Sequence, residues 1–385
     1  TDKAWWLAGA LFLIGIVYPF VVDPLQELPV IGDFVPRTGS MVVMLVVTMM
    51  ALGLNVVVGY AGLLDLGYVA FYAAGAYVAG WLASIHFEDV NFHFLSEGDG
   101  EAGIHISVWL VLIIAGVFTT LVGIAIGLPT LRLRGDYLAI VTLGFGEIVP
   151  QFVRNADNIG GFDLTAGTFG IAPIDSLGFG SFVFRQESNK DDLYFWTALG
   201  LLLFTVFCCI RLRDSRLGRA WIAIREDETA AAAMGVPLMR TKTWSYAIGA
   251  FFGGVAGAFY ASYKAGAFPA DFFFNFSIFL LCMVILGGMG SIWGVFVGGM
   301  ILGYLNIEGL STIGSKVQDA GLDFDPTKYQ FGIYGAIIVA MMLFRPTGLI
   351  PERRHKIELE EGVRDTPFYD VQTEGTLTDR DSSDD

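Results

Sequence analysis

Residues 213–242 read RDSRLGRAWIAIREDETAAAAMGVPLMRTK, a charged segment within a sequence that is otherwise strongly apolar. Leu217, Trp221 and Ile224 follow the i, i+4, i+7 spacing of one helical face, and charged side chains occupy the rest of the predicted helix surface. The apolar stretches on both sides of the segment are each about as long as a bilayer requires. The pattern therefore predicts two membrane spans joined by an amphipathic helix.

The ends of this predicted helix carry suitable capping residues. Ser215 is expected to cap its start, because a serine oxygen accepts a hydrogen bond from a free backbone N–H there. Gly235 and then Pro237 are expected to end it, since glycine adopts the left-handed conformation that closes a helix and proline does not continue one. An ordered connection of this kind is typical of a docking site for another protein. The periodicity leaves open a second interpretation, a helix that lies on lipid headgroups.

The composition of the whole chain excludes an ordinary soluble protein. The 385 residues are 54% hydrophobic and 16% charged, and their mean hydropathy is +0.60, whereas soluble domains carry about 25% charged residues. Cys208, Cys209 and Cys282 lie in apolar runs and are expected to be buried packing residues. The first residues, TDKAWW, enter an apolar run without a small-x-small cleavage site, so a retained span is predicted there rather than a signal peptide.

The apolar segments predict an all-α polytopic membrane protein with about ten transmembrane helices. Most have roughly the 20 residues that a bilayer requires. The predicted spans are residues 4–22, 40–60, 67–87, 106–131, 137–153, 193–212, 243–263, 276–289, 291–306 and 329–345. Segments 137–153, 276–289 and 291–306 are short, so they are expected to be either half-helices or tilted spans.

Basic residues predict how these spans are oriented, because cytoplasmic loops of membrane proteins are enriched in Lys and Arg. The segment 212–242 is rich in arginine and is placed inside, as are the LRLRGD turn at 131–136 and the basic cluster at 345–356. The acidic loop 88–105 contains no Lys or Arg and is placed outside, together with 154–192. This alternation predicts a multi-pass protein of the cell membrane with both chain ends inside.

The net charge of −15 is concentrated in the predicted external loops and in the tail. Residues 1–353 are predicted to form the transmembrane domain, and 354–385 an acidic cytoplasmic tail with too few apolar residues to fold. This acidity, with Lys scarcer than Arg, favours a halophilic protein, because a Debye length of about 3 Å at 1 M salt weakens repulsion between like charges. The alternative is an acidic tail without such an adaptation.

A glycine-rich stretch, LGLNVVVGYAGLLDLGYVAFYAAGAYVAG at residues 52–80, carries polar groups at membrane depth. Its glycines give smooth helix faces that allow backbones to approach closely, and packing is their simpler role. Asn55 and Tyr60 either find partners among neighbouring groups or line a path through the membrane.

Glu147 is the ionisable residue best placed within a predicted span, where such residues usually have a function. Two glycines before it and Pro150 after it weaken the helix, as is common beside transport paths. One hypothesis places Glu147 at the pathway or a gate. The alternative places it near the outer end of its span, paired with Arg154.

Five blocks of sequence resemble, in the same order, the permease subunits of ABC importers for branched-chain amino acids, on the LivM side of that family. They are GLN-x3-GYAGL-x2-LG-x3-F-x3-GAY from Gly53, RLRGDYLAIVTLGFGEI at 132–148, SRLGRAWIAIREDETAAAAMGV at 215–236, LGGMGSIWGVFVGG at 286–299 and FRPTGLIPER at 344–353. The resemblance covers about residues 40–353.

Asp65 and Tyr68 depart from the family pattern, which commonly has a small polar residue and a His or Gln at these positions. This difference bears on the substrate more than on the fold. Asp65 is expected to be a cap or loop residue.

The resemblance implies a pore-forming subunit that works with several partners in the lipid bilayer. They are a second, LivH-like permease subunit, two cytoplasmic ATPase subunits of the LivG and LivF type, and an external solute-binding protein. No cofactor and no enzymatic activity are expected of this chain itself, because the partner ATPases bind the ATP. The sequence agrees, since it contains no G-x4-GK[ST] phosphate-binding loop. No metal site, catalytic residue or nucleic-acid partner is predicted.

The resemblance also assigns roles to residues. The segment from Leu217 to Gly235 is expected to couple the chain to the ATPases. Because Trp221 is the largest apolar group on the apolar face of this segment, we expect it to be the anchor in a partner's pocket. The candidate coupling residues are Leu217, Gly218, Arg219, Trp221, Ile224, Arg225, Glu226, Asp227, Glu228 and Gly235. The candidate residues of the translocation path are Asn55, Gly59, Tyr60, Gly62, Tyr68 and Glu147.

Other functions stay open at this point. A permease for urea or a short amide would have a similar sequence, because the external binding protein sets the substrate. A secondary transporter driven by an ion gradient would need carboxylates in several spans and would leave the 212–242 segment without a role. A membrane-embedded enzyme is disfavoured by the absence of clustered His, Cys or acidic residues from the sequence.

Overall fold

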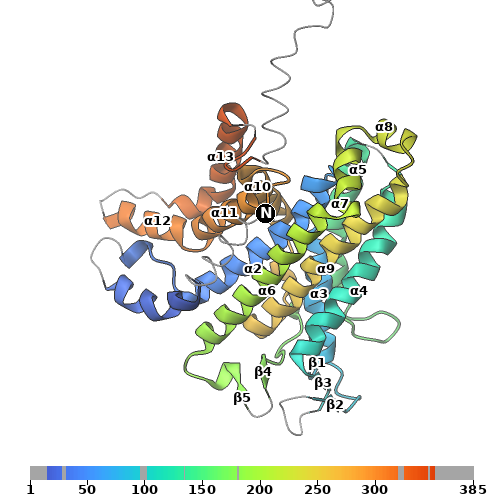
Figure 1. The fold of residues 1–385 in the computed structure, drawn as a ribbon. Helices are drawn as coiled ribbons and strands as arrows, with labels where there is room; N and C mark the ends of the chain where they lie inside the picture. The colour runs from blue at the N-terminus through green and yellow to red at the C-terminus, as the bar shows by residue number, and fades with distance from the viewer. Residues whose placement is uncertain are drawn as a thin grey trace, which may run out of the picture.

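The computed structural model describes residues 15–27, 32–95, 102–133, 135–179, 182–319, 325–345 and 347–351. Most helices in this part of the chain run between two opposite ends of the molecule (Figure 1). One end carries the short strands and is called the sheet end. The other carries α7 (Arg216–Glu226) and α8 (Glu228–Ala233) and is called the segment end. The acidic tail at 354–385 lies outside the described residues, so its predictions rest on the sequence alone.

The helices follow the predicted spans closely. Residues 15–26 are helical. The further long helices are α2 (Thr38–Asn55), α3 (Val69–Leu82), α4 (Val108–Thr130), α5 (Asp136–Asn155), α6 (Lys190–Asp214), α9 (Leu238–Lys264), α10 (Phe274–Gly287), α11 (Ile292–Tyr304), α12 (Leu310–Asp319) and α13 (Gln330–Phe344). Two π-helical turns, η2 (Val56–Tyr60) and η6 (Leu305–Gly309), continue α2 and join α11 to α12. Short 3-10 turns are η1 (Gly32–Phe34), η3 (Gly167–Phe169), η4 (Phe184–Gln186), η5 (Pro269–Asp271) and η7 (Pro326–Tyr329).

Each predicted span overlaps a helix. Some of these helices are too short or too polar to be recognised as membrane spans by length and hydropathy alone. In the described residues, six helical stretches meet that criterion: Gly32–Tyr60, Val108–Thr130, Lys190–Asp214, Pro269–Gly287, Ile292–Asp319 and Pro326–Phe344. Among the others, α3 is shorter and α5 carries polar residues along one face. The central helix α9 is rich in Gly and Ala because it faces protein rather than lipid.

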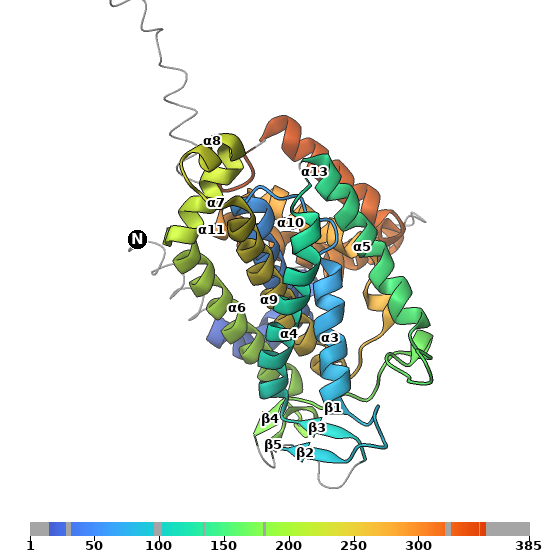
Figure 2. The ribbon, with the colours of Figure 1, turned by 90° about the vertical axis from the view of Figure 1, so that its right-hand side faces the viewer.

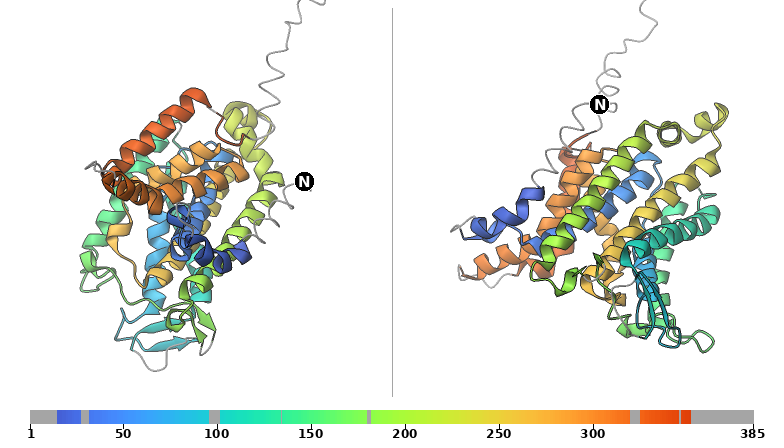
Figure 3. Two further views of the ribbon diagram at one scale, coloured as in Figure 1. Left: turned by 90° about the vertical axis from the view of Figure 1, so that its left-hand side faces the viewer. Right: turned by 60° about the horizontal axis from the view of Figure 1, so that its bottom comes forward.

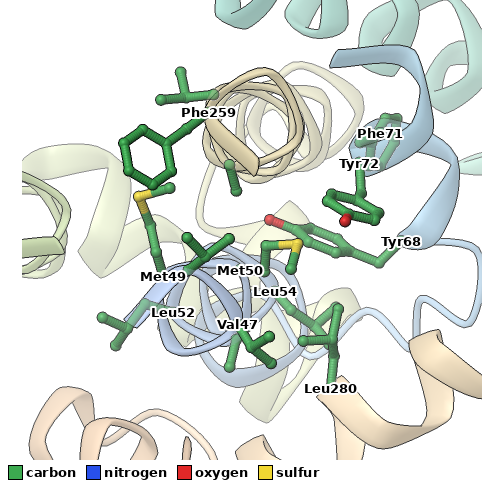
Figure 4. Close-up of a cluster of buried hydrophobic side chains, with 14 of the residues drawn as sticks. Val47, Met49, Met50, Leu52, Leu54, Tyr68, Phe71, Tyr72, Phe259 and Leu280 are labelled. Carbon is green, nitrogen blue, oxygen red and sulfur yellow. The ribbon is translucent and has the colours of Figure 1, made fainter. Parts of the chain in front are cut away.

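The core of the molecule lies where α9 packs against α2, α3 and α4. The backbones of α3 and α9 come very close, because a Cβ at Gly75 would overlap the backbone of Gly254 and a Cβ at Gly257 would overlap the carbonyl of Tyr72. Figure 4 shows the neighbouring apolar contacts, in which Met49 of α2 points toward Phe259 of α9. The packing role predicted for the glycines of residues 52–80 is therefore confirmed at Gly75.

The sheet end is closed by short strands and loops (Figure 2). Strand β3 (Ile104–Ile106) lies between β1 (Ala83–Ser84) and β2 (Phe92–Phe94), antiparallel to β1 and parallel to β2. A second, antiparallel pair is β4 (Gly178–Phe179) and β5 (Phe182–Val183). The sheet-end terminus of α9 is bound to these loops, since the Ser262 carbonyl accepts from Arg185 Nη2 at 2.8 Å and Ser262 Oγ donates to the Asp175 carbonyl at 2.9 Å.

The loops separate between the two ends as the predicted alternation requires. The turns at 61–67, 131–133 and 288–291 lie at the segment end with α7 and α8, whereas the described parts of the sheet-end loops, 83–95, 102–107, 156–179 and 182–189, lie at the other end (Figures 1 and 3). The loops predicted to face the cytoplasm thus share one end, and those predicted to face outward share the other.

Candidate functional site

The segment between α6 and α9 folds as two helices. Ser215 Oγ accepts a hydrogen bond from Gly218 N at 3.2 Å, so the predicted cap of α7 is confirmed. The expected single helix is interrupted at Asp227, whose backbone is extended and whose Oδ1 accepts from Thr229 N and Ala230 N at 2.7 and 2.9 Å. An aspartate that satisfies the first amides of a helix starts a new one, which is why α7 ends and α8 begins there. Gly235 follows α8 with a φ of +85°, in the role expected of it.

The inner face of α7 consists of the residues that the helical spacing grouped together. Trp221 is 0% exposed and Ile224 is buried, while Leu217 is half-buried against the same core. The Trp221 indole donates from Nε1 to the carbonyl of Thr241, in α9, at 2.8 Å. The expectation that Trp221 anchors a partner is therefore wrong for this structure, because its own chain already encloses the side chain.

The outer face of the segment is formed by α8 and the charged side of α7. Its exposed residues are Arg216, Arg219, Glu226, Asp227, Thr229, Ala230, Ala232, Ala233, Met234 and Gly235. Met234 is 84% exposed and is the large apolar group of this face. The sequence reasoning missed it, although its position directly before Gly235 places it at the tip of the turn that ends α8.

Besides the hydrogen bond of Trp221, two further polar contacts described by the structure hold the segment to the bundle. Lys242 Nζ in α9 lies 2.8 Å from Glu228 Oε1 in α8. Arg225 Nη1 in α7 donates to the Gly59 carbonyl oxygen, in η2, at 2.6 Å. Gly62, with a φ of +68°, lies against the stem of Arg225. Residues predicted separately for coupling and for the path are thus neighbours at the segment end.

Four of the residues predicted for the path make contacts within the chain. Asn55 is buried and its Oδ1 accepts from Gly290 N at 2.9 Å. Tyr68 is buried and its hydroxyl donates to the Gly249 carbonyl at 2.8 Å. Gly59 and Tyr60 are buried as well, so packing rather than an open passage surrounds these four positions in the structure.

Asp65 lies in the turn between η2 and α3, as expected of a loop residue. Its Oδ1 accepts from Gly67 N at 2.9 Å, and the Tyr246 hydroxyl lies beside the carboxyl group. Burial raises the pKa of Asp65 to about 6, because an enclosed carboxylate loses its hydration while a protonated carboxyl loses much less.

Glu147 is exposed, in contrast to the buried path candidates Asn55, Gly59, Tyr60 and Tyr68. It shares one face of α5 with Gln151 and Arg154, following the i, i+4, i+7 spacing of a helix. Together with Phe273 and Asn275, at the start of α10, these side chains line an open groove of about 190 Å³. The Arg154 guanidinium lies 5.6 Å from the centre of the Phe273 ring. A polar face on a helix that runs from one end of the bundle to the other is suited to contact with water or with another protein.

The sequence was compared with known proteins. A family model described as the branched-chain amino acid transport system permease component matches residues 37–342. The chain belongs to this family. It is 34% identical over 381 residues to the high-affinity branched-chain amino acid transport system permease protein LivM of Salmonella typhimurium. The aligned residues are 94% of this chain and 78% of the relative.

More distant members of the family agree with this assignment. The chain is 27% identical over 323 residues to the probable LivM of Methanocaldococcus jannaschii, covering 79% of this chain and 90% of the relative. It is 24% identical over 311 residues to the LivH permease protein of Escherichia coli, covering 78% and 90%. No solved structure matches the chain. Family membership confirms the resemblance carried by the sequence motifs and the location of the chain in a membrane.

Proposed function

We propose that this chain is the LivM-like permease subunit of an ABC importer for branched-chain amino acids, driven by ATP hydrolysis in partner subunits. The observation that carries the proposal is the exposed α7–α8 projection at one end of a helix bundle whose family is that of branched-chain amino acid permeases. A permease that draws energy from a separate ATPase needs such a projection, because the movement of the ATPase has to reach the spans through a direct contact.

The proposed ATPase contact is the outer face of α8. Met234 projects from it beside three exposed alanines, so a flexible apolar side chain stands on a surface with little steric bulk. Methionine is enriched in interface cores, where its flexibility allows it to fill irregular pockets. Arg219 and Glu226 on the charged side of α7 form the polar rim. In this proposal Trp221 supports the projection from below and does not touch the partner.

The proposed topology has ten spans with both chain ends in the cytoplasm. The gathering of the predicted inner loops at the segment end supports it, as do α3, α5 and α9, which run between the segment end and the sheet end beside the apolar helices α4 and α6 (Figure 1). Residues 1–353 then form the permease domain and 354–385 a cytoplasmic tail. The sheet end faces outward and is the side on which a solute-binding protein docks.

The proposed translocation path runs along the polar face of α5. A carboxylate such as that of Glu147 is costly against lipid, so an exposed one on a membrane-crossing helix faces water or protein. A second, LivH-like permease on this side would enclose a passage between the two subunits. Glu147, Gln151 and Asn275 would line its outer half.

The test is reconstitution of the chain in liposomes with a LivH-like permease, two ATPases and a solute-binding protein. We expect uptake of leucine, isoleucine or valine that requires ATP and the binding protein, and that excess urea does not reduce. ATP-dependent uptake of urea but not of these amino acids would instead favour the urea or short-amide alternative. Uptake by the permeases alone, driven by a proton or sodium gradient, would identify a secondary transporter.

A further inference from the structure

The contact between Arg225 and Gly59 joins the α7–α8 segment to the end of α2. Gly59 lies in η2, the π-helical turn that ends the helix, and the last carbonyls of a helix have no partner within it. A guanidinium at 2.6 Å from such a carbonyl forms a charge-assisted hydrogen bond and also lies at the negative end of the helix dipole. Arg225 therefore fixes where η2 lies relative to α7.

The same turn is closely packed on both sides. A Cβ at Gly62 would come within 2.9 Å of Arg225 Cγ. A Cβ at Gly59 would overlap Asn55 Oδ1 and come within 2.5 Å of Gly290 N. Arg225 also borders an open groove of about 290 Å³ on the exposed side of Gly62. A shift of Arg225 toward η2 has to displace this turn, whereas a shift into the groove has to break the hydrogen bond to Gly59.

Asn55 carries the connection onward to a third part of the chain. Its Oδ1 accepts from Gly290 N at 2.9 Å, in the turn between α10 and α11, and both residues are buried. On its other side this turn is held by the segment that follows α13, since Leu349 N donates to the Leu286 carbonyl at 2.9 Å and Ile350 N donates to that of Gly287 at 3.1 Å. The α10–α11 turn is thus held between α2 and the segment after α13.

We propose that Arg225 and Asn55 are positioning residues that transmit movement of the α7–α8 segment through η2 to the α10–α11 turn. A π-helical turn suits this role, because π-helical turns occur frequently at functional sites and a change between π and α hydrogen bonding gives a helix end two discrete arrangements. The inference rests on the proposed function for the source of the movement, whereas the contacts themselves do not depend on it.

The first experiment does not depend on transport. Amide hydrogen exchange is measured on the full-length chain with its partners in lipid nanodiscs, for Arg225→Met, which removes the donor, and Arg225→Lys, which keeps one. Arg211→Met is the matched control, since Arg211 is exposed on α6 and its guanidinium lies 5.5 Å from the centre of the Phe207 ring of the same helix. We expect faster exchange at residues 286–292 only in Arg225→Met. Wild-type exchange there would overturn the proposal.

The second experiment measures solute uptake per ATP hydrolysed. Arg225→Met and Asn55→Ala are each expected to lower this ratio about tenfold, within the usual range of coupling energies, while ATP hydrolysis and co-purification with the ATPases persist. Arg225→Lys should restore most of the ratio. The double variant should be no worse than the poorer single variant, because both changes interrupt one connection.

The outcomes separate this inference from the proposed function. The connection would be refuted if the double variant lost uptake per ATP by the product of the two single losses. It would also be refuted if either single variant kept the wild-type ratio of uptake to ATP hydrolysis. Wild-type hydrogen exchange in α9 would show that the Asn55→Ala variant is folded. If this variant does not fold, the comparison of Arg225→Met with Arg225→Lys decides alone. Absence of ATP-driven uptake by the wild-type complex would refute the proposed function. The role of the Arg225 contact would then be decided by the hydrogen-exchange experiment.

Discussion

Lys242 Nζ lies 2.8 Å from Glu228 Oε1, yet the lysine side chain is 4% exposed and the glutamate side chain 29% exposed. The pair joins α8 to the second turn of α9, so it holds the exposed projection against the central helix. Since the ammonium is the more enclosed of the two groups, it is the one that loses more when its partner is removed.

Glu228→Gln is therefore expected to destabilise the chain more than Lys242→Met does. The first change leaves a buried ammonium without its carboxylate, at a cost of roughly 1–3 kcal/mol in the free energy of unfolding. The second leaves a carboxylate that reaches water. Thermal midpoints in detergent, with the double variant expected between wild type and Glu228→Gln, test this order. A lower midpoint for Lys242→Met than for Glu228→Gln would contradict it.

Trp221 and Met234 are expected to respond in opposite ways to truncation. Trp221→Ala empties a buried site and should cost about 3–5 kcal/mol of stability, whereas Met234→Ala should leave the thermal midpoint unchanged and weaken ATPase binding about tenfold, as loss of an interface side chain commonly does. Trp221→Phe keeps most of the volume and should lose only about 1 kcal/mol with the hydrogen bond to Thr241. Normal ATPase binding by Met234→Ala would remove α8 from the interface.

Glu147→Gln is expected to reduce uptake without changing the thermal midpoint, because the side chain is exposed and its charge rather than its packing is altered. Glu27→Gln is the matched control: the same change at an exposed residue after the helix at 15–26, outside α5 and the sheet-end strands. Initial uptake rates of the reconstituted complex distinguish the two. Equal rates for both variants would leave Glu147 without a role in the path.

Asp65 should make stability depend on pH. Its raised pKa of about 6 means that the folded state holds the proton more tightly than the unfolded state does. Its contribution is therefore complete below about pH 4, where the unfolded carboxyl is protonated too. The contribution is lost as the pH rises through about 6. Thermal midpoints between pH 4 and 8 should fall less in Asp65→Asn than in wild type, with exposed Asp89→Asn as the control; parallel curves would exclude this contribution.

Orientation can be tested at exposed positions on the two ends. Phe162 and Phe169 at the sheet end are 77% and 85% exposed, close to the 84% of Met234 at the segment end. A membrane-impermeant thiol reagent should label Phe162→Cys and Phe169→Cys in intact cells. It should label Met234→Cys only after permeabilisation, in cells that lack the ATPases. Labelling of Met234→Cys from outside would reverse the proposed topology.

Periodicity predicted which face of α7 is buried but not what buries it. Leu217, Trp221 and Ile224 face inward as expected, because a helix repeats every 3.6 residues whatever its neighbour is. That the neighbour is α9 depends on a tertiary contact to Thr241, which spacing does not encode. A buried aromatic and an interface aromatic therefore give the same sequence pattern.

The polar residues also show that the sequence pattern does not identify tertiary partners. Asn55 reads equally well as a path residue or a packing residue, and its partner Gly290 lies far away in the sequence. Asp227 looked like part of a charged helix surface, although its ability to bond to its own backbone was the signal for the break. For Glu147, an ionisable group in an apolar run indicates a functional residue, and its exposure on α5 agrees with a role in the path, which stays a prediction.

The continuity of α9 has a consequence for signalling across the membrane. Its 27 residues span about 40 Å at the helical rise, with Thr241 and Lys242 bound to the α7–α8 segment near one end and Ser262 bound to the sheet-end loops near the other. Unless the rod bends, a push on either tip must appear at the opposite one. In the proposed complex, solute delivery at the sheet end and ATP hydrolysis at the segment end would therefore act on one continuous helix, so that each event could affect the other directly.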